Sequence, residues 1–247
     1  MRLAVIADVH GNLRALDAVL ADVARHAPDA IVNLGDCVSG PLAAAATADR
    51  LMAHGFVTVR GNHDRALVEQ PASAMGESDR AAAAELTPAH FAWLAALPAT
   101  VTIEQVLLCH GTPTSDLAYL AERVRGSDVT VPSPDELDAR LGDVRATIVL
   151  GGHTHRPRVL RSSRGRLVVN PGSVGLPAFT SDDELPHVVE NGSPHARYAV
   201  IDVRAEPVVQ LIAVPYDWDA AARDATAAGR PDWAHALATG CARPPSS

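Results

Sequence analysis

The chain has 247 residues, of which 47% are hydrophobic and 20% are charged, and its formal net charge is −8. These values indicate a folded globular protein rather than a disordered one. The negative charge argues against a long polyanion such as duplex DNA as a partner, so phosphate chemistry would need a local positive site. No apolar run reaches the roughly 18 residues needed to span a bilayer, and the first one stops at Asp8, unlike a signal peptide. With three scattered cysteines and no disulfide pattern, we expect a reduced, cytoplasmic protein without membrane association.

Strands and helices alternate through the first part of the chain. Short runs rich in branched residues predict strands, and apolar residues at helical spacing predict helices between them. The predicted strands are 2–7, 30–34 and 56–59, and the predicted helices are 13–25, 42–54 and 79–96. This alternation favours a mostly parallel α/β sheet.

The second part of the chain is richer in strands. The runs 101–109, 147–150, 159–161, 167–170, 198–203 and 208–214 are strand-like, and 217–238 returns to helix. The Ser162–Gly165 turn predicts an antiparallel hairpin between two of these strands. Residues 176–196 predict a long loop excursion. No domain boundary is visible, so we expect one domain over residues 1–247.

Five polar clusters each follow a predicted strand directly. They are Asp8-Val9-His10-Gly11-Asn12, Gly35-Asp36, Gly61-Asn62-His63-Asp64, His110-Gly111 and Gly151-Gly152-His153-Thr154-His155. Side chains two apart on an extended backbone point to the same side, so Asp8 and His10 are expected to grip one ion. Carboxyl ends of strands in an α/β sheet line one crevice, where ligands bind. Each cluster alone is more often a turn, but the five together indicate a metal-binding rim.

These motifs, in this order, resemble those of the calcineurin-like metallophosphoesterase superfamily. The similarity is to its small bacterial and archaeal single-domain phosphodiesterases, and the stretch Asn170-Pro171-Gly172-Ser173-Val174 fits the same branch. The resemblance implies an α/β fold of four layers, an α/β/β/α sandwich of two mixed β-sheets flanked by helices. It also implies a hydrolase site with two metal ions.

Carried over position by position, the resemblance implies a complete ligand set. Asp8, His10 and His155 would bind one metal, Asn62, His110 and His153 the other, and Asp36 would bridge both. His63 would face the substrate without binding metal, and Asp64 would be its orienting partner.

The chemistry of these ligands is consistent with two divalent cations. Two such ions repel each other and need an anionic bridge, which Asp36 and a hydroxide supply. The centre then keeps a positive charge of about +1 after Asp8, Asp36 and the hydroxide are counted. Imidazoles, an amide and carboxylates without thiolate favour transition metals, manganese first, with iron, zinc, cobalt or nickel as alternatives.

A phosphodiesterase mechanism follows as a hypothesis. The metal-bridging hydroxide attacks phosphorus in line, and His63 protonates the departing alkoxide as general acid. The segment Gly35–Gly40 lacks the arginine that clamps a dianionic phosphate in related phosphatases, which favours a small diester over a monoester. Arg156, beside His155, is the candidate for binding a substrate phosphate.

Three alternatives stay open: a phosphomonoesterase, a nuclease, and a non-catalytic scaffold with this fold. The acidic charge and short chain count against a polymeric nucleic acid substrate. The intact set of ligands counts against a scaffold. Residues 176–196 are expected near the active-site rim, as a lid or as the interface of a homo-oligomer.

Overall fold

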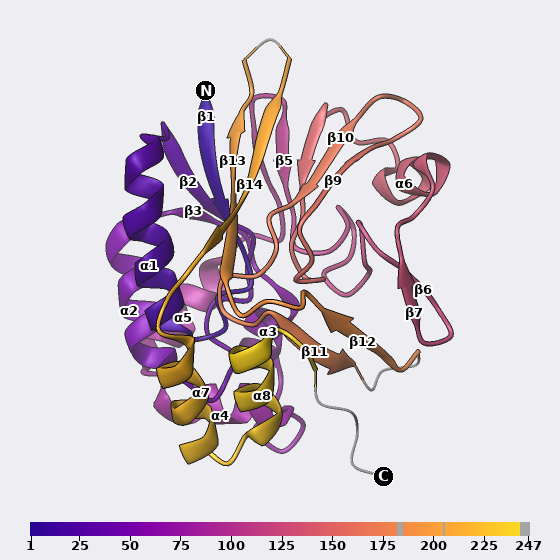
Figure 1. The fold of residues 1–247 in the computed structure, drawn as a ribbon. Coiled ribbons are helices and arrows are strands. Elements are labelled where there is room, and N and C mark those ends of the chain that lie inside the picture. The colour runs from indigo at the N-terminus through magenta and orange to yellow at the C-terminus, as the bar shows by residue number, and fades with distance from the viewer. Residues whose placement is uncertain (182–184, 205, 243–247) are drawn as a thin grey trace.

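Two five-stranded mixed sheets lie face to face at the centre of the protein, in the computed structural model that describes residues 1–181, 185–204 and 206–242 (Figure 1). The apolar layer between them joins side chains of both sheets, for example Leu3 and Val5 with Leu108 and Ile148. Helices cover the two outer faces. The predicted four-layer α/β/β/α sandwich is therefore confirmed.

The first sheet combines the beginning of the chain with its end. Its order is β14-β13-β1-β2-β3, where β1, β2 and β3 run parallel and β13 is antiparallel to both β1 and β14. The strands are β1 (Arg2–Ile6), β2 (Ala30–Asn33), β3 (Val57–Thr58), β13 (Ala196–Asp202) and β14 (Val208–Val214). Helices α1 (Leu13–Val23), continued by the 3-10 turn η1 (Ala24–His26), and α2 (Ala44–His54) make the crossovers and pack on its outer face.

The second sheet has the order β4-β5-β8-β10-β9, with β5, β8 and β10 parallel. Its strands are β4 (Val101–Ile103), β5 (Val106–Leu108), β8 (Ile148–Leu150), β9 (Arg158–Arg161) and β10 (Leu167–Asn170). The predicted hairpin at Ser162–Gly165 joins β9 to β10 and is confirmed. Helix α6 (Pro134–Leu141) covers the outer face with Leu137 and Leu141.

Three predicted elements are divided in the structure, each at a residue that breaks regular backbone. The strand predicted over 101–109 is the hairpin β4–β5, which turns at Glu104 with a φ of 52°. The helix predicted over 79–96 is α4 (Glu77–Glu85) and α5 (Pro88–Ala96), because Thr87 caps a new helix before Pro88. The helix predicted over 217–238 is α7 (Trp218–Ala227) and α8 (Pro231–Thr239), separated at Gly229, whose φ is 75°.

Four further elements were not predicted. Helix α3 (Asn62–Glu69) follows β3, and the hairpin of β6 (Arg123–Arg125) and β7 (Asp128–Thr130) precedes helix α6, which was not predicted either. The fourth is a hairpin of β11 (Ala178–Ser181) and β12 (His187–Glu190), so the expectation that 176–196 is a loop was wrong. Residues 182–184 within that segment lie outside the described residues.

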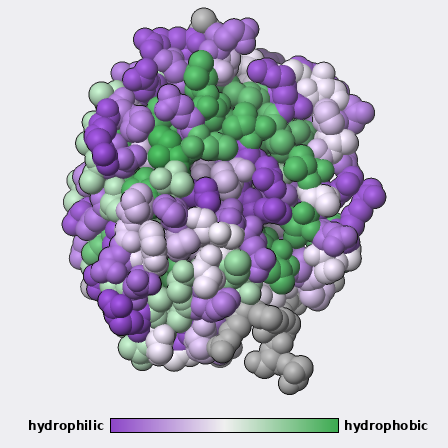
Figure 2. All heavy atoms as spheres, in the orientation of Figure 1, coloured by the Kyte–Doolittle hydropathy of each residue, from purple (hydrophilic) through white to green (hydrophobic). Residues whose placement is uncertain are grey.

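Strand β14 forms one edge of the first sheet and carries no charged residue. Val208 and Leu211 are exposed along it, and Figure 2 shows apolar side chains gathered over this side of the molecule.

Among the described residues, no helix combines the length and the apolar character required to cross a bilayer.

Candidate metal centre

The carboxyl ends of the parallel strands in both sheets meet at one edge of the sandwich. Asp8 and His10 follow β1, Asp36 follows β2, and Asn62 begins the helix after β3. From the second sheet, His110 follows β5, while His153 and His155 follow β8. The structure thus brings together all seven predicted ligands, from strand ends far apart in sequence.

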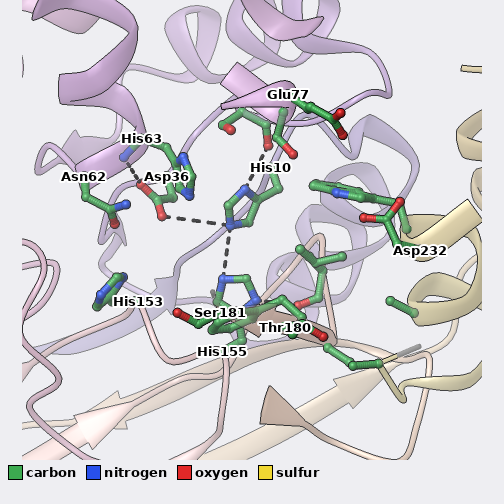
Figure 3. A pocket seen from close by; sticks show the side chains of 18 of the residues that line it. His10, Asp36, Asn62, His63, Glu77, His153, His155, Thr180, Ser181 and Asp232 are labelled. Carbon is green, nitrogen blue, oxygen red and sulfur yellow. Dashed lines mark hydrogen bonds and ion pairs between the residues drawn. The ribbon is translucent and has the colours of Figure 1, made fainter. Parts of the chain in front are cut away.

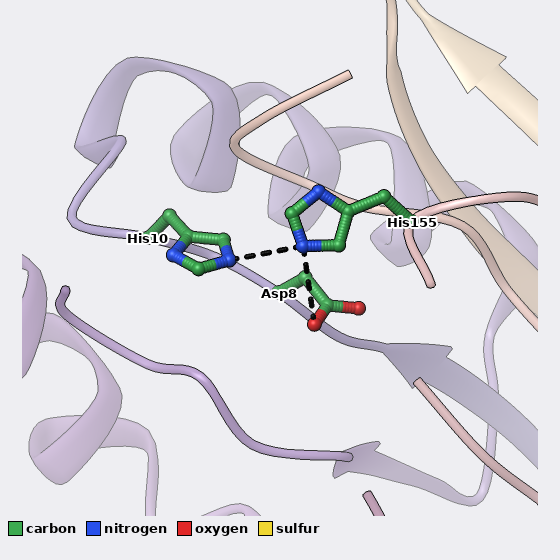
Figure 4. Close-up of side chains that lie close together, drawn as sticks. All are labelled: Asp8, His10 and His155. Atoms are coloured by element: carbon green, nitrogen blue, oxygen red, sulfur yellow. Dashed lines mark hydrogen bonds and ion pairs between the residues drawn. The ribbon is translucent and has the colours of Figure 1, made fainter. Parts of the chain in front are cut away.

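The first group of donor atoms comes from Asp8, His10 and His155, whose ligand atoms all lie within 4.8 Å of one another (Figure 4). The Nε2 atoms of His10 and His155 are 3.1 Å apart, and Asp8 Oδ1 is 3.5 Å from His155 Nε2. All three side chains are buried.

The second group comes from Asp36, His110 and His153, again within 4.8 Å. His110 Nε2 lies 3.2 Å from Asp36 Oδ2 and 3.0 Å from Asn62 Oδ1. Asp36 Oδ2 is also 3.9 Å from His10 Nε2, in the first group. Asp36 therefore faces both groups, as a bridging carboxylate must.

The hydrogen bonds on the far side of each ring identify which nitrogens remain as ligands. The Nδ1 atoms of His10, His110 and His155 donate to the carbonyl oxygens of Ser39, Leu34 and Leu176, at 2.7–2.8 Å. Their Nε2 atoms are left to face the centre. His153 is reversed: its Nε2 donates to Leu117 O at 2.9 Å, which leaves Nδ1. Such fixing of the outer nitrogen is typical of metal-binding histidines.

The first group fits a cation and little else. Because Nδ1 carries the hydrogen in both His10 and His155, two nitrogen lone pairs face each other at 3.1 Å. Burial lowers the pKa of His10 to about 4 and the pKa of His155 well below its usual range, so protons do not relieve this contact near neutral pH. A divalent ion bound between these nitrogens and Asp8 would satisfy all three donors.

The pKa values of the two carboxylates and of His110 are shifted by burial and by the charges of their neighbours. Burial raises the pKa of Asp8 to about 8. Burial also opposes the charge of Asp36, but His110 and His63 outweigh it and hold the pKa of Asp36 well below its usual range. Burial would lower the pKa of His110, yet Asp36 raises it to about 10, so a proton sits where a cation would bind.

The backbone of the ligand loops is strained. Asp8, His10, Asp36, His153 and His155 all have φ between 50° and 69°, a region that residues other than glycine seldom adopt. Strain of this kind gathers at functional sites. Asp8 and His10 point to the same side because both residues have a left-handed backbone conformation. The expectation that they do so on an extended backbone was wrong.

His63 lies beside the two groups, on α3, and lines the cavity in front of them. Its Nδ1 donates to Asp79 Oδ1 at 2.8 Å, so Nε2 is the nitrogen left for a substrate. Burial would lower the pKa of His63, but Asp36 and the hydrogen bond to Asp79 raise it to about 9. The imidazole is therefore held in its protonated form near neutral pH.

Asp64 does not make the contact expected for it. Its carboxylate accepts backbone N–H groups from Asp36 at 2.8 Å, Cys37 at 2.9 Å and Gly61 at 3.0 Å. It does not orient the His63 ring, a role that Asp79 fills instead, so this assignment was wrong. Asp64 positions the loop that carries Asp36. Gly61 is required there because a Cβ at this position would lie 2.2 Å from Asp36 Oδ1.

The loop after β10 supports the ligands through its side chains as well as its backbone. Asn170 Nδ2 donates to Gly152 O at 2.7 Å and to Thr154 Oγ1 at 3.0 Å, inside the segment that carries both histidines. Ser173 Oγ donates to Asp8 O at 2.8 Å. These contacts fix the spacing between the ends of β1 and β8.

A cavity of about 1170 Å³ opens over the two groups (Figure 3). His10, Asp36, Asn62, His63, His153 and His155 form its floor, and β11, β12 and α8 supply much of its walls. Arg156 does not line it and instead lies 3.8 Å from Glu122, so the structure does not bring it together with the ligands, and its contact with substrate phosphate stays a prediction. The guanidinium at the wall belongs to Arg230, which no sequence motif indicated.

Asp79 was also missed, because it stands in an alanine-rich helix without any motif. Arg230 carried a weak signal, as the residue before Pro231 at a helix start. Neither position could be connected to the ligand motifs without knowing that α4 and α8 pack beside the strand ends.

Comparisons with known proteins agree with this geometry. The structure is similar to that of a metallophosphoesterase from Sphaerobacter thermophilus, with 25% sequence identity, a TM-score of 0.76 and coverage of 97% of this chain and 99% of the other. It is similar in fold to PH1004 from Pyrococcus horikoshii OT3, with 18% identity, a TM-score of 0.76 and coverage of 98% and 99%. A search among curated proteins found no match. A sequence profile of the calcineurin-like phosphoesterase superfamily domain matches residues 1–189, three quarters of the chain. The chain therefore belongs to the calcineurin-like phosphoesterase superfamily, whose divalent metal ions suit its two Asp/His groups.

Proposed function

We propose that the protein hydrolyses small phosphodiesters with two divalent transition-metal ions, manganese first among them. The observation that carries this proposal is the position of Asp36 between two Asp/His groups, with His63 beside it at the floor of one cavity.

The described residues would have separate roles in binding metal, donating a proton and orienting the donor. Asp8, His10 and His155 would hold one ion, Asn62, His110 and His153 the other, with Asp36 shared. When bound, the ions would supply positive charge to the phosphate oxygens and an activated water that attacks phosphorus. His63 would give the proton on Nε2 to the departing alkoxide, which leaves as an alcohol. Asp79 keeps that ring oriented and charged.

A diester is favoured over a monoester by the charges at the cavity wall. Among the described residues that line the cavity, Arg230 is the single guanidinium. It is paired with Asp232 at 2.6 Å and lies 3.7 Å from Glu77, so its charge is already compensated. A monoester carries close to two negative charges near neutral pH and would need a free cation there. A diester carries one.

The test compares two esters on one preparation. Manganese-loaded protein should hydrolyse bis(p-nitrophenyl) phosphate with a higher kcat/KM than p-nitrophenyl phosphate, and chelation followed by metal return should abolish and restore both activities. A clear preference for the monoester would overturn the diester assignment. Absence of turnover with every metal would favour the scaffold alternative.

Small substrates are favoured over nucleic acid polymers because the net charge of −8 repels a polyanion. Degradation of single-stranded DNA at moderate salt would support the nuclease alternative. A cytoplasmic location fits the free thiols of Cys37, Cys109 and Cys241, and it stays a prediction, as does a homo-oligomer.

A further inference from the structure

The cavity has two unlike walls. On the side of His63, helices α4 and α8 present Glu77, Ser78, Arg230 and Asp232. Figure 3 shows Glu77 and Asp232 across the cavity from His153. The opposite wall is formed by the loop after β5, by β6 and by the hairpin β11–β12. We call this second surface the apolar wall: Leu117, Tyr119, Val124, Phe179 and Leu185.

Two leucines of the apolar wall are left in solvent. Leu117 is 61% exposed and Leu185 is 52% exposed, and both line the cavity that holds the metal ligands. Among the described large apolar residues, only Val208, on the distant edge strand β14, is comparably exposed at 57%. Apolar side chains gathered in solvent at the rim of a cavity are typical of a ligand-binding groove.

The apolar wall is continuous with the metal centre. Leu117 O accepts the Nε2 hydrogen of His153 at 2.9 Å, and the Tyr119 ring stands edge-on to His153 with centroids 4.9 Å apart. The Phe179 ring stands edge-on to His155 at 4.7 Å. A phosphate held at these histidines would therefore have an apolar surface directly beside it.

A side-chain hydrogen bond joins the hairpin side of this wall to the loop after β5. His187 Nδ1 donates to Leu185 O at 2.7 Å, so its Nε2 accepts the hydroxyl hydrogen of Tyr119, at 2.9 Å. This bond connects β12 to the loop after β5. The wall is thus preorganised, which lowers the entropy lost when a ligand binds.

The position of His63 decides which part of a diester would meet this wall. In an in-line displacement the leaving group departs on the side of the general acid, here the side of helix α4, whose Asp79 holds the His63 ring. The ester group that stays on phosphorus points elsewhere, and the apolar wall is the surface open to it. Resting on the proposed diesterase function, we propose that the apolar wall is a subsite for an apolar or aromatic ester group that is retained on the phosphate.

The test varies only the retained group. Native protein is assayed with p-nitrophenyl methyl phosphate and p-nitrophenyl phenyl phosphate, both of which release p-nitrophenol. The phenyl ester should have the higher kcat/KM, by about tenfold, because its ring covers both leucines. In Leu117→Ser, Leu185→Ser and the double variant, that ratio should fall toward one. Val208→Ser, equally exposed but outside the cavity, is the matched control and should keep the native ratio.

Each possible outcome supports or overturns the proposed subsite. Equal kcat/KM for the two esters in native protein, or an unchanged ratio in the leucine variants, would overturn the subsite while leaving the diesterase function intact. Absence of turnover of both esters would overturn the diesterase function and this subsite with it. A native dimer that dissociates in the leucine variants, measured by gel filtration, would assign the wall to a second copy of the chain instead.

Discussion

His63 and Asp79 form a charged pair across two successive helices, with 2.8 Å between Nδ1 and Oδ1. Asp79 is buried, whereas the His63 side chain is about one third exposed to the cavity. The carboxylate therefore lies behind the ring and leaves its other nitrogen open. This arrangement orients a proton donor and raises its pKa with a single contact.

Asp79→Asn should lower kcat by about tenfold to 100-fold, because an uncharged amide orients the ring less well and no longer favours the imidazolium. Since Asp79 raises the pKa of His63, its loss lowers that pKa. The alkaline limb of the pH profile of kcat should move to lower pH. Asp49→Asn removes a similar contact, at 3.0 Å from His90 away from the cavity, and should change neither quantity. Additive losses in the His63→Ala, Asp79→Asn double variant would contradict a shared role.

Asp36→Ala should lose both activity and metal, because this carboxylate faces both groups and would be shared by both ions. His63→Ala removes a proton donor and no ligand, so metal content should persist while kcat falls about 100-fold or more. The loss should be smaller for esters with acidic leaving groups, which need little protonation. Elemental analysis of both variants is the measurement. Two metal ions per chain retained in Asp36→Ala would contradict the bridging role.

Asp64→Asn should lower the free energy of unfolding by about 2–4 kcal/mol, since the amide cannot accept all three backbone N–H groups that the buried carboxylate accepts. Urea denaturation of the metal-free protein measures this. Asp224→Asn is the control, because its pair with Arg14 is half exposed and should contribute little. Equal stability of the two variants would exclude Asp64 as the support of the Asp36 loop.

Metal binding should tighten as pH rises from about 6 to 9, because a cation must displace protons from Asp8 and His110. Burial raises the pKa of Asp8 to about 8, and Asp36, against the effect of burial, raises that of His110 to about 10. Both groups hold their protons below these values, so acid competes with the metal. Calorimetry in buffers of different ionisation enthalpy should show protons released on binding. An affinity independent of pH would mean that these groups are already ionised without metal.

The resemblance to the superfamily implied the ligand set, and the strand ends explain why these side chains come together. Each motif directly follows a short apolar run, and the parallel order of such runs brings their carboxyl ends together. The local backbone could not be predicted, since nothing in a sequence announces that Asp8 or His153 adopts a positive φ. His10, His153 and His155 converge because of that conformation rather than by strand alternation.

Contacts that depend on how whole helices pack could not be predicted from the sequence either. Asp79 contacts His63 only because α4 packs beside α3. Asp64 accepts hydrogen bonds from backbone N–H groups, and no sequence motif indicates such bonds. The same reason explains why Arg156 lies outside the cavity lining. Its neighbour His155 turns inward on a left-handed backbone, whereas Arg156 pairs with Glu122, so adjacency in sequence did not carry into space.

The antiparallel pairing of β1 with β13 has a consequence for how the chain is made. Leu3 lies opposite Ile201, so the first strand gains its second neighbour only after residue 202 has left the ribosome. At about 5–20 residues per second, roughly 10–40 s pass between synthesis of these two strands. During that interval the ligand-bearing loop after β1 is attached to a half-paired strand. Until β13 has been made, the nascent chain offers the open edge of β1 as a pairing surface to other chains.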